Sequence, residues 1–275
     1  MSDLSTKLGS WRNAPLIYVV AELSIAPHYG LAEKIPALQK ELRSEYPRTV
    51  ELSQISISPF LGGAAGLGQP NATPTAQPAW QLISSDNTSG IAINYRAIGL
   101  HATTYSNSTD FLIRWDRVLK AVEAAHLDVY VERAGLRYID LIVPAEGHEP
   151  GEYLEANMLG PTLPGGSKVH HRMWSTAFSI NEIAIQAHAF APAPQGVLLP
   201  PTLAAIGLQM PAVLTAAQGL AQSGRSTGWI DTDVSRDVKQ SFDSQMIGTA
   251  YRDLHKALSG TFKSFLSPRA TEEWM

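Results

Sequence analysis

The segment APLIYVVAELSIA, residues 14–26, sets the pattern from which the rest of the chain is interpreted. Its side chains alternate, with Ala21 and Leu23 on one face and Glu22 between them on the other. A period of two residues is typical of a β-strand, because successive side chains point to opposite faces of the sheet. The period then changes. Apolar residues over 33–46 recur at helical spacing, which predicts a helix after the first strand.

The same two periods assign the other elements. Alternation predicts strands over residues 50–58, 79–85, 90–104, 134–144, 169–180, 183–191 and 229–238. Helical spacing predicts helices over residues 108–125, 150–159 and 242–266, with Ser108 as an N-cap and a last helical turn up to Met275. Residues 61–78 indicate a surface loop and not a phosphate-binding loop, whereas residues 203–222 fit either a strand or a helix.

The order of these elements predicts the fold class. Short turns join the strands, and helices follow groups of strands rather than each strand. This order is typical of an α+β fold, a predominantly antiparallel β-sheet covered by amphipathic helices. We expect residues 1–275 to form a single domain. Two structurally similar halves, about 13–145 and 150–275, are the alternative, because both finish with a long amphipathic helix.

Composition narrows the class of protein. Of the 275 residues, 44% are hydrophobic and 17% charged, which is enough apolar surface for a packed core. Lys and Arg number 21 against 25 Asp and Glu, a net charge of -4, so nucleic-acid binding is not expected. The chain contains no cysteine, which excludes disulfides, thiolate metal sites and cysteine nucleophiles. We find neither a secretion signal nor an apolar run long enough for a membrane span, and we expect a cytoplasmic protein.

Several segments carry a resemblance to a known family: WRNAPL (residues 11–16), the helical stretch from Ile35 to Pro47, GLRYID (135–140) and the closing stretch 265–274. Together they resemble a sporadically distributed, functionally uncharacterised bacterial family of similar length. That family has no established activity or catalytic residues, so the resemblance implies no role for a named position. Its patchy distribution implies accessory genes, such as toxin–antitoxin, immunity or phage-defence loci.

One short motif points to a nucleophilic serine. The segment GRSTG, residues 224–228, matches the G-x-S-x-G pattern around Ser226, and Asp231, Asp233 and His255 follow in the order of an α/β-hydrolase. That chemistry requires a helix directly after the serine, to lift its hydroxyl above the sheet. A strand follows here instead. We therefore expect a turn at Ser226 and no catalytic residue.

The histidines do not predict a metal site. His170 and His171 are neighbours in a predicted strand and point to opposite faces, so they cannot bind one ion together. Pairing about the turn at residues 181–182 places His188 opposite Ser175 and not opposite either histidine. We expect no metal and no other cofactor.

Five polar residues remain as candidates for a pocket: Glu22, Arg137, Asp140, Asp231 and Asp233. Glu22 lies in a strand rich in apolar residues. Alternation places Arg137 and Asp140 on opposite faces, and Asp231 and Asp233 on the same face. A charge on an apolar face either pairs across strands or lines a pocket, and we expect pairing.

Two functions are consistent with these observations. The first is a cytoplasmic macromolecule-binding accessory protein, with a protein partner or self-association as a homodimer, and without catalysis. The alternative is an enzyme or small-ligand sensor whose pocket is built from distant strands. A concave pocket with convergent polar groups and perturbed pKa values favours the alternative. A flat apolar patch with a polar rim favours the first function.

Overall fold

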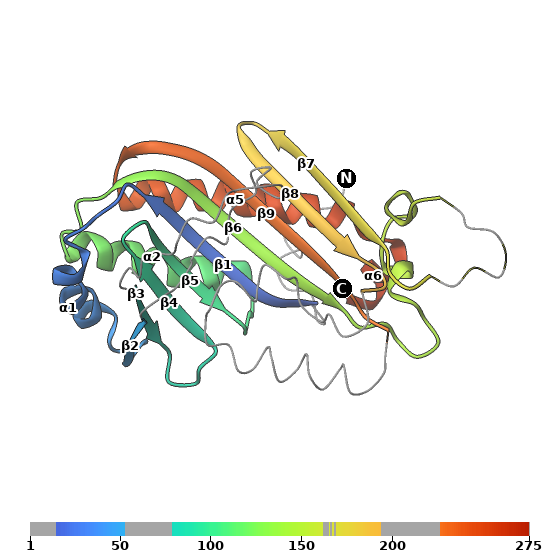
Figure 1. Cartoon of the computed structure of the whole chain (residues 1–275), viewed down its shortest axis with the longest axis horizontal. Helices are drawn as coiled ribbons and strands as arrows, with labels where there is room; N and C mark the ends of the chain where they lie inside the picture. Colours follow the sequence, from blue (N-terminus) through green and yellow to red (C-terminus); the bar gives the residue numbers. More distant parts are fainter. Residues whose placement is uncertain are drawn as a thin grey trace, which may run out of the picture.

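A computed structural model describes residues 15–52, 79–161, 165, 167, 169–193 and 226–274 of the chain. Within these residues, nine strands form one sheet in the order β2-β3-β4-β5-β1-β6-β9-β8-β7, and neighbouring strands are antiparallel (Figure 1). The strands are β1 (Leu16–Ile25), β2 (Arg48–Leu52), β3 (Ala79–Ile83), β4 (Ser89–Asn94), β5 (Ala97–Ala102), β6 (Tyr130–Ile142), β7 (Met173–Ile180), β8 (Ile183–Phe190) and β9 (Gly228–Ser241). The predicted α+β class with an antiparallel sheet is confirmed.

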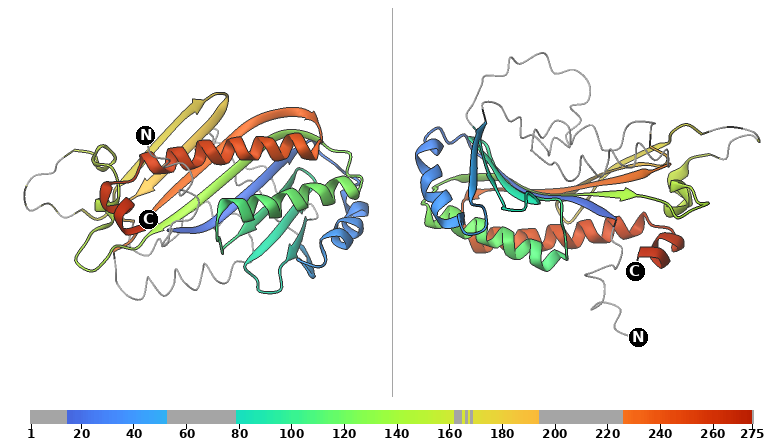
Figure 2. Two further views of the ribbon diagram at one scale, coloured as in Figure 1. Left: turned by 180° about the vertical axis from the view of Figure 1, so that it is seen from behind. Right: turned by 90° about the horizontal axis from the view of Figure 1, so that it is seen from below.

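The helices lie mainly on one face of the sheet. They are α1 (Leu31–Leu42), α2 (Ser108–Ala124), α5 (Ser244–Ser264) and α6 (Pro268–Trp274), with two 3-10 turns, η1 (Pro150–Tyr153) and η2 (Ala156–Leu159). Helices α2 and α5 lie side by side across one face, and we call this face the helix face (Figure 2). Helix α1 packs against α2, and α6 packs against η1 near the C-terminus. None of the described helices has both the length and the apolar character that crossing a membrane requires.

The main core lies between the sheet and these helices. Trp115 of α2 and Tyr251 of α5 are fully buried and meet edge to face, with ring centroids 5.1 Å apart. Apolar residues of β1, including Ala21 and Leu23, pack beneath them. Burial of each large apolar side chain stabilises the fold by about 1.5–3 kcal/mol, so this layer fixes the helices on the sheet.

The structure corrects three local predictions. The predicted strand over 90–104 is two strands, β4 and β5, because the chain reverses at Tyr95 and Arg96, where Asn94 Oδ1 accepts the Arg96 N–H at 2.8 Å. The N-cap of α2 is Asn107 and not Ser108, since the Asn107 side chain accepts the N–H of Asp110.

The predicted helix over 150–159 is the pair of 3-10 turns η1 and η2. The predicted loop 61–78, the ambiguous segment 203–222 and the end of the strand predicted over 50–58 lie outside the described residues.

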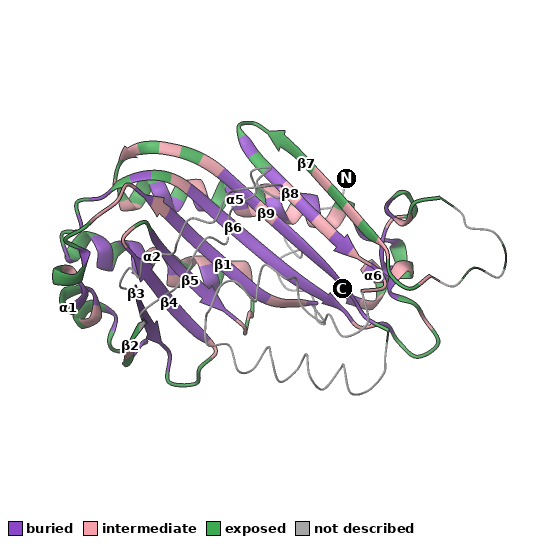
Figure 3. Cartoon of the chain, in the orientation of Figure 1, coloured by how far each residue is buried: buried purple, intermediate pink, exposed green. Residues whose placement is uncertain are grey.

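Strands from the two halves of the chain share the sheet. Strands β6 and β9 pair from Tyr130 opposite Ser241 to Ile142 opposite Gly228. The inner strands β1 and β6 are buried over most of their length and β9 over its first half, whereas β7 is largely exposed (Figure 3). The face of the sheet opposite α2 and α5 carries no helix among the described residues, and we call it the second face.

Candidate functional site

Polar side chains from several strands gather on the second face. Alternation along each strand directs them there, away from the apolar residues of the helix face. We call this group the sheet-face cluster; its members are Glu22, Gln81, His101, Arg133, Arg137, Asp231 and Asp233. Five of them are at most 4% exposed, and Arg133 and Asp233 are half-buried. Charged residues are rarely buried to this degree without a specific reason.

The centre of the cluster is an ion pair between β6 and β9. Arg137 donates from Nε to Oδ1 of Asp231 at 2.7 Å, and from Nη2 to Oδ2 of the same carboxylate. Two parallel bonds of this kind are the strongest arrangement of a guanidinium and a carboxylate. Asp233, directly opposite Arg137 in the strand register, adds a second acid beside the same guanidinium. The expected pairing across strands is confirmed for Arg137.

Glu22 lies in a gap between two glycines. Gly99 of β5 and Gly135 of β6 are its direct neighbours across the strands. A Cβ atom at Gly99 would lie 3.8 Å from the Cβ of Glu22 and would narrow this space. Ala92 and Ser235 continue the same row on either side, so small residues leave room around the Glu22 carboxyl.

Burial changes the protonation of Glu22 and Asp233. It raises the pKa of Glu22 to about 8, although the charge of Arg133 lowers it. Burial likewise raises the pKa of Asp233 to about 8, against the opposing charge of Arg137. Glu22 Oε2 and Asp233 Oδ1 are buried and have no hydrogen-bond partner among the described residues. Both carboxyls are therefore mainly protonated at neutral pH and hold unused hydrogen-bonding capacity.

His101 and Gln81 form a second buried polar pair. Their Nε2 atoms lie 3.2 Å apart. Since an amide nitrogen only donates, the imidazole accepts at Nε2 and its proton resides on Nδ1. Burial lowers the pKa of His101 to about 4, which keeps the ring neutral. A Cβ atom at Gly90 would lie 2.6 Å from His101 Nε2, so glycine is required there for the imidazole to fit.

A hollow of about 390 Å³ adjoins the cluster over β8 and β9. Its polar lining consists of Arg133, Asp233, Ser235, Gln186 and Ser179. Arg133 and Asp233 belong to both the hollow and the sheet-face cluster, so the hollow connects the buried polar groups with the surface. A concave space with a few convergent polar groups is the usual form of a small-molecule site.

Four of the five sequence candidates meet at this site, and Asp140 does not. Asp140 lies on the helix face with Tyr138, whose hydroxyl is 3.1 Å from Nδ1 of His255 on α5. Burial raises the pKa of Asp140 well above its ordinary value, and the charge of Asp231 adds to the effect. The prediction that Arg137 and Asp140 occupy opposite faces is thus correct.

The serine motif does not assemble a catalytic triad. Ser226 is exposed and is followed by β9 rather than by a helix. Asp231 and Asp233 lie on the second face, whereas His255 contacts Tyr138 on the helix face. The sheet itself lies between the two aspartates and His255.

The histidines of the second half are likewise dispersed. His170 and His171 are exposed, and His188 is opposite Ser175 as the hairpin predicted. On its other side, His188 is opposite Asp231 in β9. Within the described part of the chain, no three histidine or acidic side chains are placed to hold a metal ion.

Sequence reasoning missed Gln81, His101 and Arg133. The available signal was weak: each is a polar residue in an otherwise apolar or alternating segment, which is also true of many solvent-facing residues. Their strands lie far apart in the sequence, and only the pairing of β3, β4, β5, β1 and β6 brings them onto one surface.

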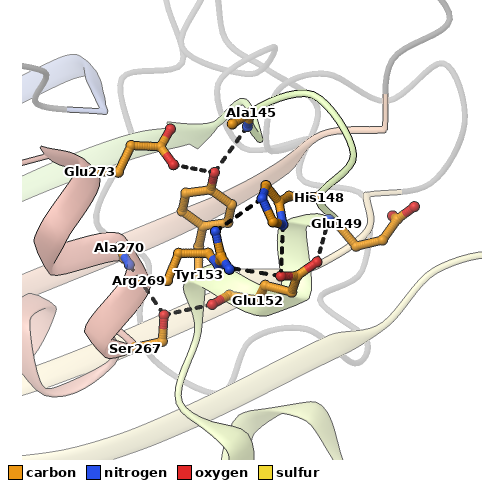
Figure 4. Close-up of polar contacts among 9 residues, drawn as sticks. All are labelled: Ala145, His148, Glu149, Glu152, Tyr153, Ser267, Arg269, Ala270 and Glu273. Carbon is orange, nitrogen blue, oxygen red and sulfur yellow. Dashed lines mark hydrogen bonds and ion pairs between the residues drawn. The ribbon is translucent and has the colours of Figure 1, made fainter.

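A second polar group lies near the C-terminus, and we call it the terminal network (Figure 4). Tyr153 donates its O–H to Glu273 at 2.5 Å and accepts the N–H of Ala145. Arg269 contacts both Glu152 and His148, which are themselves 3.0 Å apart. These contacts join α6 to η1 and to the segment before it, and Glu152, Arg269 and His148 are partly exposed to solvent. The network thus fixes the position of the last helix.

Comparison of the chain with protein-family models, curated proteins and solved structures finds no match. The geometry of the sheet-face cluster is therefore the basis for inferring function.

Proposed function

We propose that this chain binds a small organic anion, such as a carboxylate or a phosphate ester, in the hollow beside the sheet-face cluster. One observation carries the proposal: the hollow is lined by donors and leads to buried polar atoms that have no partner among the described residues. Buried polar groups are normally hydrogen-bonded, so unsatisfied ones beside a hollow indicate where a ligand supplies the missing bonds.

The lining favours an anion over a cation. Arg133 provides a guanidinium, Ser179 and Ser235 provide hydroxyls, and Gln186 provides an amide. Asp233 is the one acid among the residues that line the described hollow, and its raised pKa makes it a donor at neutral pH. Charge-assisted hydrogen bonds from a guanidinium to a carboxylate or phosphate are the strongest that such a site can form.

The charge balance of the cluster agrees with this preference. At neutral pH, Arg137 is paired with Asp231, while Glu22 and Asp233 are mainly neutral and do not repel an anion. Arg133 is half-buried and lines the hollow, so its guanidinium adds positive charge there. Ionisation of Glu22 and Asp233 above about pH 8 would add negative charge beside the hollow and weaken the attraction for an anion.

This proposal follows the second of the two functions expected from the sequence, a ligand sensor with a pocket built from distant strands. Binding of a macromolecule is the second candidate, because β7 exposes Met173, Phe178 and Ile180. We further propose the cytoplasm as the location. A role in a toxin–antitoxin, immunity or phage-defence locus stays a prediction from the family resemblance.

Thermal unfolding with probe ions tests the proposal. We expect citrate or phenyl phosphate to raise the Tm and benzylamine not to raise it; at a ligand concentration of 100 Kd the stabilisation is about 2.7 kcal/mol. Arg133→Gln should abolish this increase, whereas Arg236→Gln, on the helix face of β9, should leave it unchanged.

The pH dependence provides a further check. Raising the pH from about 6 to about 9 should weaken the effect of the anions, because Glu22 and Asp233 ionise in that interval. An equal Tm increase in wild type and Arg133→Gln would indicate a general salt effect and refute the proposal, as would the absence of any increase with either anion.

A further inference from the structure

Strand β7 ends the described sheet and lacks the features that normally protect such an edge. Its eight residues, MWSTAFSI, contain no charged residue and no proline. Met173 is 65% exposed, Ile180 44% and Phe178 39%. Its pairing with β8 continues without a register shift from Met173–Phe190 to Ile180–Ile183. An exposed, regular, uncharged edge strand offers unpaired backbone groups to another strand.

The opposite edge of the described sheet is shorter and carries charge. Strand β2 has five residues, RTVEL, and two of them, Arg48 and Glu51, are charged. Short length and charge are common ways in which proteins prevent pairing at an edge. The contrast singles out β7 as the edge available for association.

We propose that β7 pairs antiparallel with β7 of a second copy of this chain about a two-fold axis. Identical strands approach here without repulsion, because neither carries a charge. In such a pairing, opposite residues share a face of the sheet, so Trp174, Thr176, Phe178 and Ile180 of one copy meet the same set on the other. The pairing covers the exposed side chains of Phe178 and Ile180 with the apolar side chains of the second copy.

The pairing also affects the hollow. Ala177, Phe178 and Ser179 of β7 form its outer wall. A two-fold axis perpendicular to the sheet keeps the second faces of both copies on one side, so the partner strand extends this wall and brings the two hollows close together. This consequence for ligand binding depends on the proposed function, whereas the dimer itself does not.

Single-cysteine variants test the pairing directly, because the chain contains no cysteine of its own. Ser175, Thr176, Ala177 and Phe178 are each replaced by cysteine and oxidised. Only the residue on the two-fold axis faces its own copy within disulfide distance. We expect a covalent dimer in high yield at one of these positions and none with Glu51→Cys, an exposed position on the edge strand β2.

Sedimentation analysis of the full chain gives the second readout. We expect wild type to be a dimer and the double variant Phe178→Lys/Ile180→Lys to be a monomer, since like charges then face each other at the edge. Wild type that is monomeric at every concentration, a double variant that stays dimeric, or cross-linking equally strong at Glu51 would each overturn the pairing. Anion binding measured by Tm on the same samples separates the two proposals, because a wild-type protein that is monomeric and still binds citrate refutes only the dimer.

Discussion

The sheet-face cluster and the terminal network contain the same kinds of side chain in opposite surroundings. Each combines acids, arginine and histidine. In the terminal network the partly exposed Glu152 contacts both His148 and Arg269. In the cluster Glu22 is 4% exposed and its Oε2 has no hydrogen-bond partner among the described residues. The comparison shows that burial, rather than residue type, distinguishes a site with unused binding capacity from contacts that hold two elements together.

The two regions should respond to pH in opposite directions, and this is the largest effect we expect. The pKa of Glu22 is raised to about 8 in the folded state, so the folded protein binds more protons than the unfolded chain between its unfolded pKa and about 8. Stability is therefore greatest at low pH in this interval and falls as the pH rises. Each pKa unit corresponds to about 1.4 kcal/mol, which gives a loss on the order of 4 kcal/mol from Glu22.

Urea unfolding of wild type and Glu22→Gln across about pH 3 to 9 measures this loss. The variant should lose less stability with rising pH, because its amide does not ionise. Glu152→Gln is the matched control: backbone and His148 contacts lower the pKa of Glu152, so its contribution is lost as the pH falls. Identical pH profiles for wild type and Glu22→Gln would show that Glu22 is solvated and ionised in the folded protein.

Replacing one arginine in each region, Arg137 in the cluster and Arg269 in the terminal network, should give the next largest difference in the free energy of unfolding. Arg137→Ala leaves Asp231 buried without its bidentate partner, and we expect a loss of about 3 kcal/mol in the free energy of unfolding. Arg269→Ala removes a contact exposed to solvent and should change stability by less than about 0.5 kcal/mol.

The double variant Arg137→Met/Asp231→Leu sharpens this comparison. It removes both charges together and should recover much of the stability that Arg137→Ala loses, as replacement of buried ion pairs by apolar residues often does. Equal losses for Arg137→Ala and Arg269→Ala would contradict the distinction between the two regions.

A smaller loss than that of Arg137→Ala is expected in the buried part of the terminal network. Tyr153 is fully buried and its hydroxyl contacts Glu273 and the Ala145 N–H. Tyr153→Phe should destabilise the protein by about 1 kcal/mol, the usual net value of such hydrogen bonds. Hydrogen exchange should localise the change to α6, and protection lost uniformly across the sheet would argue against a local role for the network.

Much of the fold could be predicted from the sequence because its signals are local. The alternation in residues 14–26 and the apolar spacing in 242–266 arise from the strand and helix periods themselves. The turn at residues 181–182 was also recognisable, and both of its residues have positive φ angles. Predictions were wrong where a single side chain altered the backbone, as at Asn94, whose bond to Arg96 separates β4 from β5.

The candidate site was predicted only in part. Alternation within one strand was sufficient to place Asp231 with Asp233 and to separate Arg137 from Asp140, since this requires no knowledge of neighbouring strands. Arg137 and Asp231 are 94 residues apart in the sequence, and nothing local to either indicates that their strands are adjacent.

By itself, the sequence determined most of the elements, the antiparallel α+β class and the alternation of side chains between the two faces along each predicted strand. Only the tertiary structure decided that Glu22, His101, Arg137 and Asp233 share one surface and that β7 ends the described sheet. The physical reason is that strand order and register depend on how distant segments bury their apolar faces together, whereas side-chain alternation is a property of the backbone of a single strand.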